Sequence, residues 1–180
     1  MATIVRTNIA ARRLGIHAAL RSALDYLAEK IDTVLASGDY STELRMVEAS
    51  ISAANIVKTT AGGLSHTSGF PVVPAPGTGK YLEFVSAVLV YDYTTAAYTG
   101  GGDDIYMVNT SGNALTAACT KANSFTATAD KCVQFASINS AAVPIVANAG
   151  INILATTALT QPGTAAGTAR IRVYYREHTL

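Results

Sequence analysis

The sequence predicts a mainly β protein, in which a jelly-roll-like antiparallel β-sandwich over residues 67–180 follows an α-helical arm and linker over residues 1–66. Turn-forming residues recur about every ten residues after position 69, between short runs rich in β-branched and aromatic residues. No helix-period run of convincing length interrupts that pattern. Apolar residues before position 40 instead repeat with helical spacing, and these observations together give the division into arm and sandwich.

The arm begins with a predicted helix. Thr7 or Asn8 can cap its first turn, and Gly38 is a suitable stop after about Ser37. Five apolar residues within it are spaced four, three, four and three apart, as in a coiled-coil seam. They are Leu20, Leu24, Leu27, Ile31 and Val34. Packing against a neighbouring helix of the same chain explains this spacing as well as self-association does.

A second helix is predicted to start at Asp39 or Ser41. Its apolar side would consist of Leu44, Val47, Ile51 and Ala54. The polar, glycine-containing stretch from Lys58 to Ser68 then predicts a flexible linker to the sandwich. We therefore expect either a helical hairpin or one helix stacked on the arm of another subunit.

The sandwich opens with FPVVPAPGTGK, whose three prolines favour an edge strand or a rigid extended entry. The stretch GTGK lacks the remaining residues of a phosphate-binding loop, and a strand follows it instead of a helix. Tyr81 to Tyr93 is predicted to be the long central strand. Strict alternation would place even-numbered residues from Leu82 to Asp92 on one face and odd-numbered residues on the other, so neither face is cleanly polar.

Further strand-like runs follow the glycine-rich turn after the central strand. They are residues 105–109, 114–120, 125–127, 131–138, 143–146, 150–159 and 169–177. In the last of them, Arg170, Arg172, Tyr174 and Arg176 alternate with a largely apolar set. This basic face could bind an acidic neighbour, although a solvated face that protects a sheet edge is the more common reason for such a pattern.

Composition excludes several classes of function. Only 14% of residues are charged, against 49% that are hydrophobic, and the net charge is +1. A chain so nearly neutral is not expected to bind nucleic acid electrostatically. No apolar run reaches the roughly 20 residues of a membrane span, so no membrane partner is expected. The low charge instead predicts a neutral, threonine-rich surface that packs against copies of itself.

Motifs for chemistry are weak in this sequence. Asp92, Asp103 and Asp104 lie near glycines, but their spacing matches no calcium loop, and turn formation explains them equally well. Cys119 and Cys132 fit no zinc pattern; two buried free thiols are favoured over a disulfide between them. The three histidines have no evident partners. We therefore expect no enzymatic activity, no metal and no cofactor.

The stretch PAPGTGKYLEFVSAVLVYDYTTAAYTGGGDD, the Thr- and Ala-rich strands and the ending TARIRVYYREHTL resemble virion structural proteins of tailed bacteriophages. The resemblance covers about residues 74–180 and lies in the order and texture of the segments. It implies a β-sandwich that packs as a homotrimer or larger ring on the particle, assembled in the host cytoplasm. Its partners would be copies of itself and the major capsid protein or other virion proteins.

The expected function is therefore that of a capsid cement or decoration protein, which oligomerises on the head shell and stabilises it. An alternative is a head-fibre or tail component whose sandwich binds a host surface or a carbohydrate. The sugar site would then involve Tyr91, Tyr93 and Tyr98 with Asp103 and Asp104. The residues expected at an oligomer or capsid interface are the five seam residues of the arm together with Tyr91, Tyr93, Arg172, Tyr174 and Arg176.

Overall fold

The computed structural model describes residues 25–26, 28–29, 43–100, 104–138, 143–161 and 167–180. The chain divides into two compact units, residues 1–40 and residues 41–180. In the first unit the described residues 25–26 and 28–29 are helical. The remainder of the predicted arm helix, including Leu20, Leu24, Leu27, Ile31 and Val34, lies outside the described residues.

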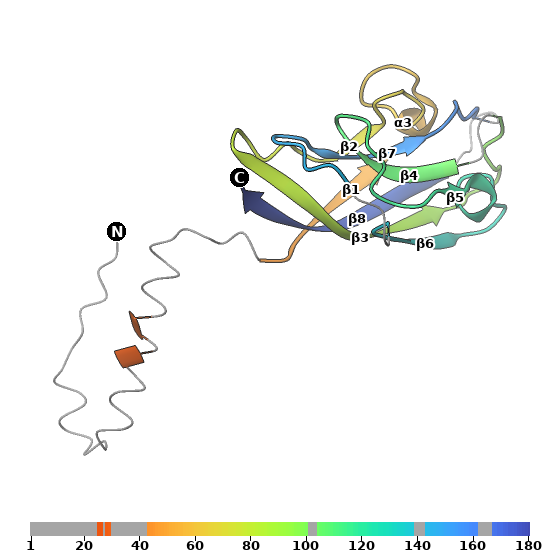
Figure 1. The fold of residues 1–180 in the computed structure, drawn as a ribbon. Coiled ribbons are helices and arrows are strands. Elements are labelled where there is room, and N and C mark those ends of the chain that lie inside the picture. The colour runs from red at the N-terminus through yellow and green to blue at the C-terminus, as the bar shows by residue number, and fades with distance from the viewer. Residues whose placement is uncertain (1–24, 27, 30–42, 101–103, 139–142, 162–166) are drawn as a thin grey trace, which may run out of the picture. The chain divides into compact units, whose positions relative to one another are not determined.

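The second unit is mainly β, with two antiparallel sheets of four strands each (Figure 1). The first sheet has the order β1-β8-β3-β6. Its strands are β1 (Arg45–Ile51), β8 (Thr168–Thr179), β3 (Lys80–Asp92) and β6 (Lys131–Ala136). The second sheet has the order β2-β7-β4-β5. Its strands are β2 (Phe70–Val73), β7 (Ile151–Ala155), β4 (Asp104–Asn109) and β5 (Cys119–Thr120).

The two sheets form two layers, and buried side chains from both make up one hydrophobic core (Figure 1). Leu89 of β3, Ile171 of β8 and Ile153 of β7 are each fully buried. At one end of the core the rings of Tyr91, Tyr98 and Phe125 pack together, with centroids 5.5 to 6.3 Å apart. Tilted and edge-on contacts of this kind suit the charge distribution of aromatic rings.

A β-bulge in β3 explains why neither face of the central strand looked polar. The pairing with β8 runs from Phe84 opposite Tyr175 directly to Ser86 opposite Tyr174, which leaves Val85 as an extra residue. The buried positions therefore change from even to odd numbers: Phe84 is buried, and then Ala87, Leu89 and Tyr91 are. The strict alternation predicted for this strand is wrong because of that single residue.

The predicted second helix is also wrong, because its first half is strand β1. This strand pairs with β8 in regular antiparallel register, from Arg45 opposite Tyr175 to Ile51 opposite Ala169. Its exposure alternates, with Met46 and Glu48 exposed and Ile51 fully buried. A period of two indicates a strand, but Val47 and Ile51 also stand four residues apart, which is a helical spacing.

Only a short helix follows, α3 (Ala53–Val57), capped by Ser52, whose side chain accepts a hydrogen bond from the backbone N–H of Asn55. The predicted linker 58–68 is part of the packed structure. Leu64 is fully buried, and its carbonyl accepts a hydrogen bond from the backbone N–H of Ala155. The interpretation of this segment as a flexible spacer is therefore wrong.

Most of the predicted strands from residue 70 onward are present, including an edge strand that contains Pro71. Three candidates differ. Residues 114–120 contribute only the two-residue strand β5, and residues 125–127 and 143–146 form no strand. Phe125 is fully buried all the same, so its hydrophobicity reflects the core rather than sheet pairing.

Candidate interaction face

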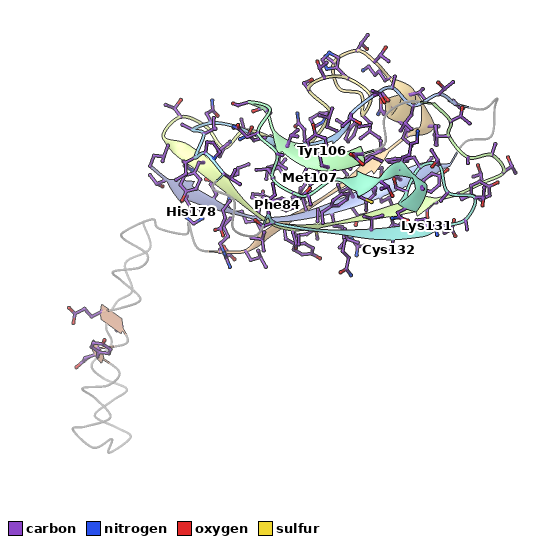
Figure 2. All side chains as sticks on the ribbon, turned by 45° about the vertical axis from the view of Figure 1, so that its right-hand side comes forward. Phe84, Tyr106, Met107, Lys131, Cys132 and His178 are labelled. Carbon is purple, nitrogen blue, oxygen red and sulfur yellow. The ribbon has the colours of Figure 1, made fainter. Side chains whose placement is uncertain are left out.

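The sheet β1-β8-β3-β6 has one side in the core and the other side, here called the outer face, turned away from the second sheet. Register places its side chains in three rows, each with one residue from every strand. The rows are Met46-Tyr174-Ser86-Ala136, Glu48-Arg172-Val88-Gln134 and Ser50-Arg170-Val90-Cys132. Glu83 opposite Arg176, with Tyr81 opposite His178, continues the face toward the end of β8. Figure 2 shows Cys132 on the side of β6 that faces away from the other layer.

Each arginine of the outer face has a carboxylate partner on a neighbouring strand. Arg172 donates a hydrogen bond to Glu48 of β1. Arg176 lies 3.2 Å from Glu83 of β3, and Arg170 lies 3.5 Å from Asp92 at the end of β3. The row that looked basic in the sequence is therefore neutralised by acidic residues that come from other segments.

The pairings of Glu48 and Glu83 lower the pKa of these two carboxyl groups. The hydrogen bond from Arg172 holds the pKa of Glu48 below its ordinary value. Burial alone would raise the pKa of Glu83, but hydrogen bonds from His178 and Arg176 outweigh it and lower the pKa. His178 also stacks on Tyr81, with ring centroids 4.8 Å apart. The face is thus ionic but charge-balanced near neutral pH.

A shallow hollow of about 110 Å³ lies in the middle of the outer face. Val88 and Val90 of β3 line it together with Glu48, Arg170 and Arg172. Ligand pockets for drug-sized molecules occupy roughly 300–1,000 Å³, so this hollow is too small for one. It has several times the volume of about 30 Å³ that one water molecule occupies, which suits a single side chain.

The predicted interface residues lie in different environments. Arg172, Tyr174 and Arg176 lie together on the outer face, with Arg172 exposed and the other two partly exposed. Tyr93 follows β3, is partly exposed, and its backbone N–H donates to Asp130. Tyr91 is completely buried in the core, so its assignment to an interface is wrong.

The predicted sugar site is not assembled by the described residues. Tyr98, like Tyr91, is buried, and its hydroxyl donates to the carbonyl of Gly167 at 2.7 Å. Burial raises the pKa of this phenol above its usual range. Asp104 begins strand β4, and Asp103 lies outside the described residues. Because two of the three tyrosines face the core, they cannot stack on a sugar from solution.

The cysteines and the carboxylates give no centre for metal chemistry in the described part of the chain. Cys119 and Cys132 are free, as favoured, but Cys132 is exposed and Cys119 only partly buried, so the expectation that both are buried is wrong. Burial raises the pKa of the Cys119 thiol. No group of three or more His, Cys, Asp or Glu side chains in the described ranges could hold a metal ion.

A second, larger hollow lies at the end of β3 opposite to the aromatic cluster, because residues 81–84 line the hollow and Tyr91 belongs to the cluster. It has a volume of about 240 Å³ and is mostly apolar, with Leu82 and Phe84 of β3, Ile151 of β7 and the loop residues Val143 and Ile145 in its lining. Its lining also includes Ser137, and residues 139–142, which follow in the sequence before Val143, are outside the described residues.

Sequence reasoning missed the acidic half of the outer face and its exposed apolar residues. Met46 is 54% exposed on β1, a segment that was assigned to a helix. The signal that could have found it is the alternation of charged and apolar residues in RMVEASI, which has period two.

No helix among the described ranges is both long and apolar enough to cross a bilayer. In the comparisons with known proteins, no family model matches this chain, and no significant match was found among curated proteins or solved structures.

Proposed function

We propose that this chain is a structural protein of a tailed-phage virion that binds the head shell as a cement or decoration protein and self-associates there. Its work would be to hold other subunits in place, without catalysis. The location on the particle and the expected homotrimer come from the resemblance of residues 74–180 to phage virion proteins and remain predictions.

The observation that carries the proposal is the strand order. The pairs β1·β8, β2·β7, β3·β6 and β4·β5 are all antiparallel, as in one long hairpin of paired strands. The further pairs β3·β8 and β4·β7 roll that hairpin into two sheets. An eight-stranded chain paired in this way has the topology of a jelly roll, an architecture that recurs in viral capsid proteins.

The character of the outer face supports self-association. Its arginines and carboxylates cancel, and apolar side chains such as Met46 and Val88 lie between the ion pairs. A face of this kind repels neither a copy of itself nor another neutral surface. It therefore suits repeated contacts in a shell better than the capture of a strongly charged ligand.

The alternative, a fibre or tail component that binds carbohydrate, has less support. The tyrosines on which it depended include two that are buried in the core, Tyr91 and Tyr98. A sugar site elsewhere on the molecule would need aromatic side chains exposed to solvent.

The test is the composition of purified particles. Heads of a phage that encodes this chain should contain it in a fixed ratio to the major capsid protein after washing in high salt, as measured by quantitative mass spectrometry. Empty shells made without it should bind the purified full-length protein up to that same ratio and should then resist heating better. Absence from washed particles, or binding that never saturates, would contradict the proposal.

A further inference from the structure

We infer that the outer face is a contact surface for a second copy of this chain, in which Met46 of each copy enters the Val88/Val90 hollow of the other. The inference rests on the self-association part of the proposed function and adds a two-fold contact, which is separate from the three-fold contacts of the expected homotrimer. It is independent of the location on a virion.

The outer face carries both halves of a complementary contact, a projecting side chain and a hollow. Met46 projects from the edge strand β1 and is 54% exposed. The hollow on the same face spans three strands, because it is lined by Glu48 of β1, by Arg170 and Arg172 of β8, and by Val88 and Val90 of β3. In a two-fold contact each surface meets its own copy, so a projection and a hollow on one face can fill each other reciprocally.

The charge of the outer face favours a neutral or charge-balanced partner, such as a second copy of this chain. Three carboxylates, Glu48, Glu83 and Asp92, pair with the three arginines of β8 within this face. A strongly acidic or basic partner would have to break those pairs and would leave one sign uncompensated. A second copy brings the same balanced set and leaves them intact. Nucleic acid is disfavoured on the same ground, because no arginine of this face lacks a carboxylate partner.

The area of the outer face determines how strong the contact between two copies should be. Four strands spaced about 4.8 Å apart, each about seven residues long, give a footprint of roughly 450 Å² per copy. Two copies would cover roughly 900 Å², which is less than the about 1,200–2,000 Å² of stable interfaces. The contact should therefore be weak and concentration-dependent for free chains. Copies held close together on a larger assembly would form it readily, because their effective concentration is high.

Position-specific cross-linking tests the contact on the full-length chain. Both native cysteines are first replaced with Cys119→Ser and Cys132→Ser. Two single-cysteine proteins are then made with Met46→Cys and with Val88→Cys, mixed, and oxidised. The expected result is a mixed disulfide dimer that forms at least about tenfold faster than in a mixture of the Ile145→Cys and Val88→Cys proteins. Ile145 is a matched control because it is apolar, 62% exposed and outside the outer face.

Sedimentation of the otherwise native chain gives the second measurement. Met46→Glu should raise the dissociation constant of the pair about tenfold or more, as loss of a central anchor does, while Ile145→Glu should change it less than about twofold. Equal cross-linking rates in the two mixtures, or equal effects of the two substitutions, would overturn the inference. A chain that shows no such contact in these two tests, but binds shells up to a fixed ratio, would contradict this inference and still support the shell-binding part of the proposed function. The failure of the one can therefore be distinguished from the failure of the other.

Discussion

At the scale of single residues, two buried tyrosines of the aromatic cluster differ in one hydrogen bond. The hydroxyl of Tyr98 donates to Gly167, whereas that of Tyr91 is buried without a partner among the described residues. A buried polar group without a partner costs free energy, and a satisfied one stabilises the fold by about 1 kcal/mol. Replacing each of the two tyrosines with phenylalanine is therefore a matched comparison of a hydroxyl that has a partner with one that has none.

Tyr98→Phe should lower the free energy of unfolding by about 1–2 kcal/mol, because it removes the hydroxyl and leaves the Gly167 carbonyl without its donor. Tyr91→Phe should leave stability unchanged or raise it, because it removes only the unpaired hydroxyl. Urea unfolding followed by circular dichroism measures both. Equal losses in the two variants would show that Tyr91 has a hydrogen bond after all.

The ion pairs of Glu177 should make the stability of the fold depend on pH. Its carboxylate lies 2.6 Å from both Lys80 of β3 and Arg45 of β1, so it joins three strands. The hydrogen bond from Lys80, followed by the charge of Arg45, holds its pKa below the ordinary value of 4.5. A lowered pKa in the folded state means that the pairs stabilise the protein fully above pH 4.5 and less as acid protonates the folded carboxylate.

Glu177→Gln should therefore reduce the free energy of unfolding by about 1 kcal/mol at pH 7. The difference from the unsubstituted chain should shrink as the pH falls below 4.5 and should vanish once Glu177 is protonated in both states. Unfolding curves measured between pH 7 and pH 3 check this. A difference that stays constant across that range would rule out ionisation of Glu177 as its cause.

The sequence identified outer-face residues only where one strand carried the whole pattern. Arg172, Tyr174 and Arg176 were placed together because β8 alternates regularly. Their partners Glu48 and Glu83 come from segments 124 and 93 residues away, and no local pattern reports such distances. The burial of Tyr91 was missed for a local reason, since the bulge at Val85 changes which side of β3 it faces.

At the scale of elements, the bulge can be tested by deletion. Removing Val85 would place Phe84 and Ser86 opposite Tyr175 and Tyr174 in a regular ladder and would keep Ala87 facing the core. Removing Val88 instead would also allow the bulge to be lost, with Phe84, Leu89 and Tyr91 still facing the core but Ser86 and Ala87 exchanging sides. The two deletions are equal in size and lie in the same strand.

The chain without Val85 should fold and lose less than about 2 kcal/mol of stability, in the range of ordinary single changes. The chain without Val88 should lose more stability than that, because the hydroxyl of Ser86 would take the buried place of the Ala87 methyl group. Thermal unfolding and the dispersion of amide signals in NMR spectra distinguish these outcomes. Failure of both chains to fold would mean that Val85 has a packing role of its own.

Elements with strong local signals were predictable and those defined by tertiary contacts were not. β3 and β8 are long and rich in β-branched and aromatic residues, so their propensity matches their environment. β1 contains Met, Glu and Ala, which favour a helix, and it is a strand because β8 provides its hydrogen-bonding partner. The segment after α3 looked like a linker because its polar composition hid one buried leucine, Leu64.

At the scale of the whole molecule, the boundary between the units determines which truncations are informative. Residues 41–180 form the second compact unit, and β1 belongs to its first sheet. A deletion of residues 2–40 leaves all eight strands in place. A deletion of residues 2–52 also removes β1 and uncovers one edge of β8, whose Ile171 and Val173 are fully buried.

The chain without residues 2–40 should keep the thermal midpoint of the β unit within a few degrees. The chain without residues 2–52 should lose several kcal/mol or fail to fold, because apolar area next to β8 becomes exposed. If the arm provides the contact with the shell, the first truncated chain will be folded and yet will not bind shells. Full binding by that folded chain would instead assign the contact to the β unit.

The strand order also bears on how this polypeptide reaches its native state. β8 is the last of the eight strands in sequence, yet it lies between β1 and β3 in the first sheet. Arg45 and Glu177, which hold β1 to β8, are 132 positions apart. During synthesis on the ribosome β1 therefore has no hydrogen-bonding neighbour in that sheet until β8 has emerged. Late closure of so distant a pair is slow, and it makes chaperone binding to the nascent chain advantageous.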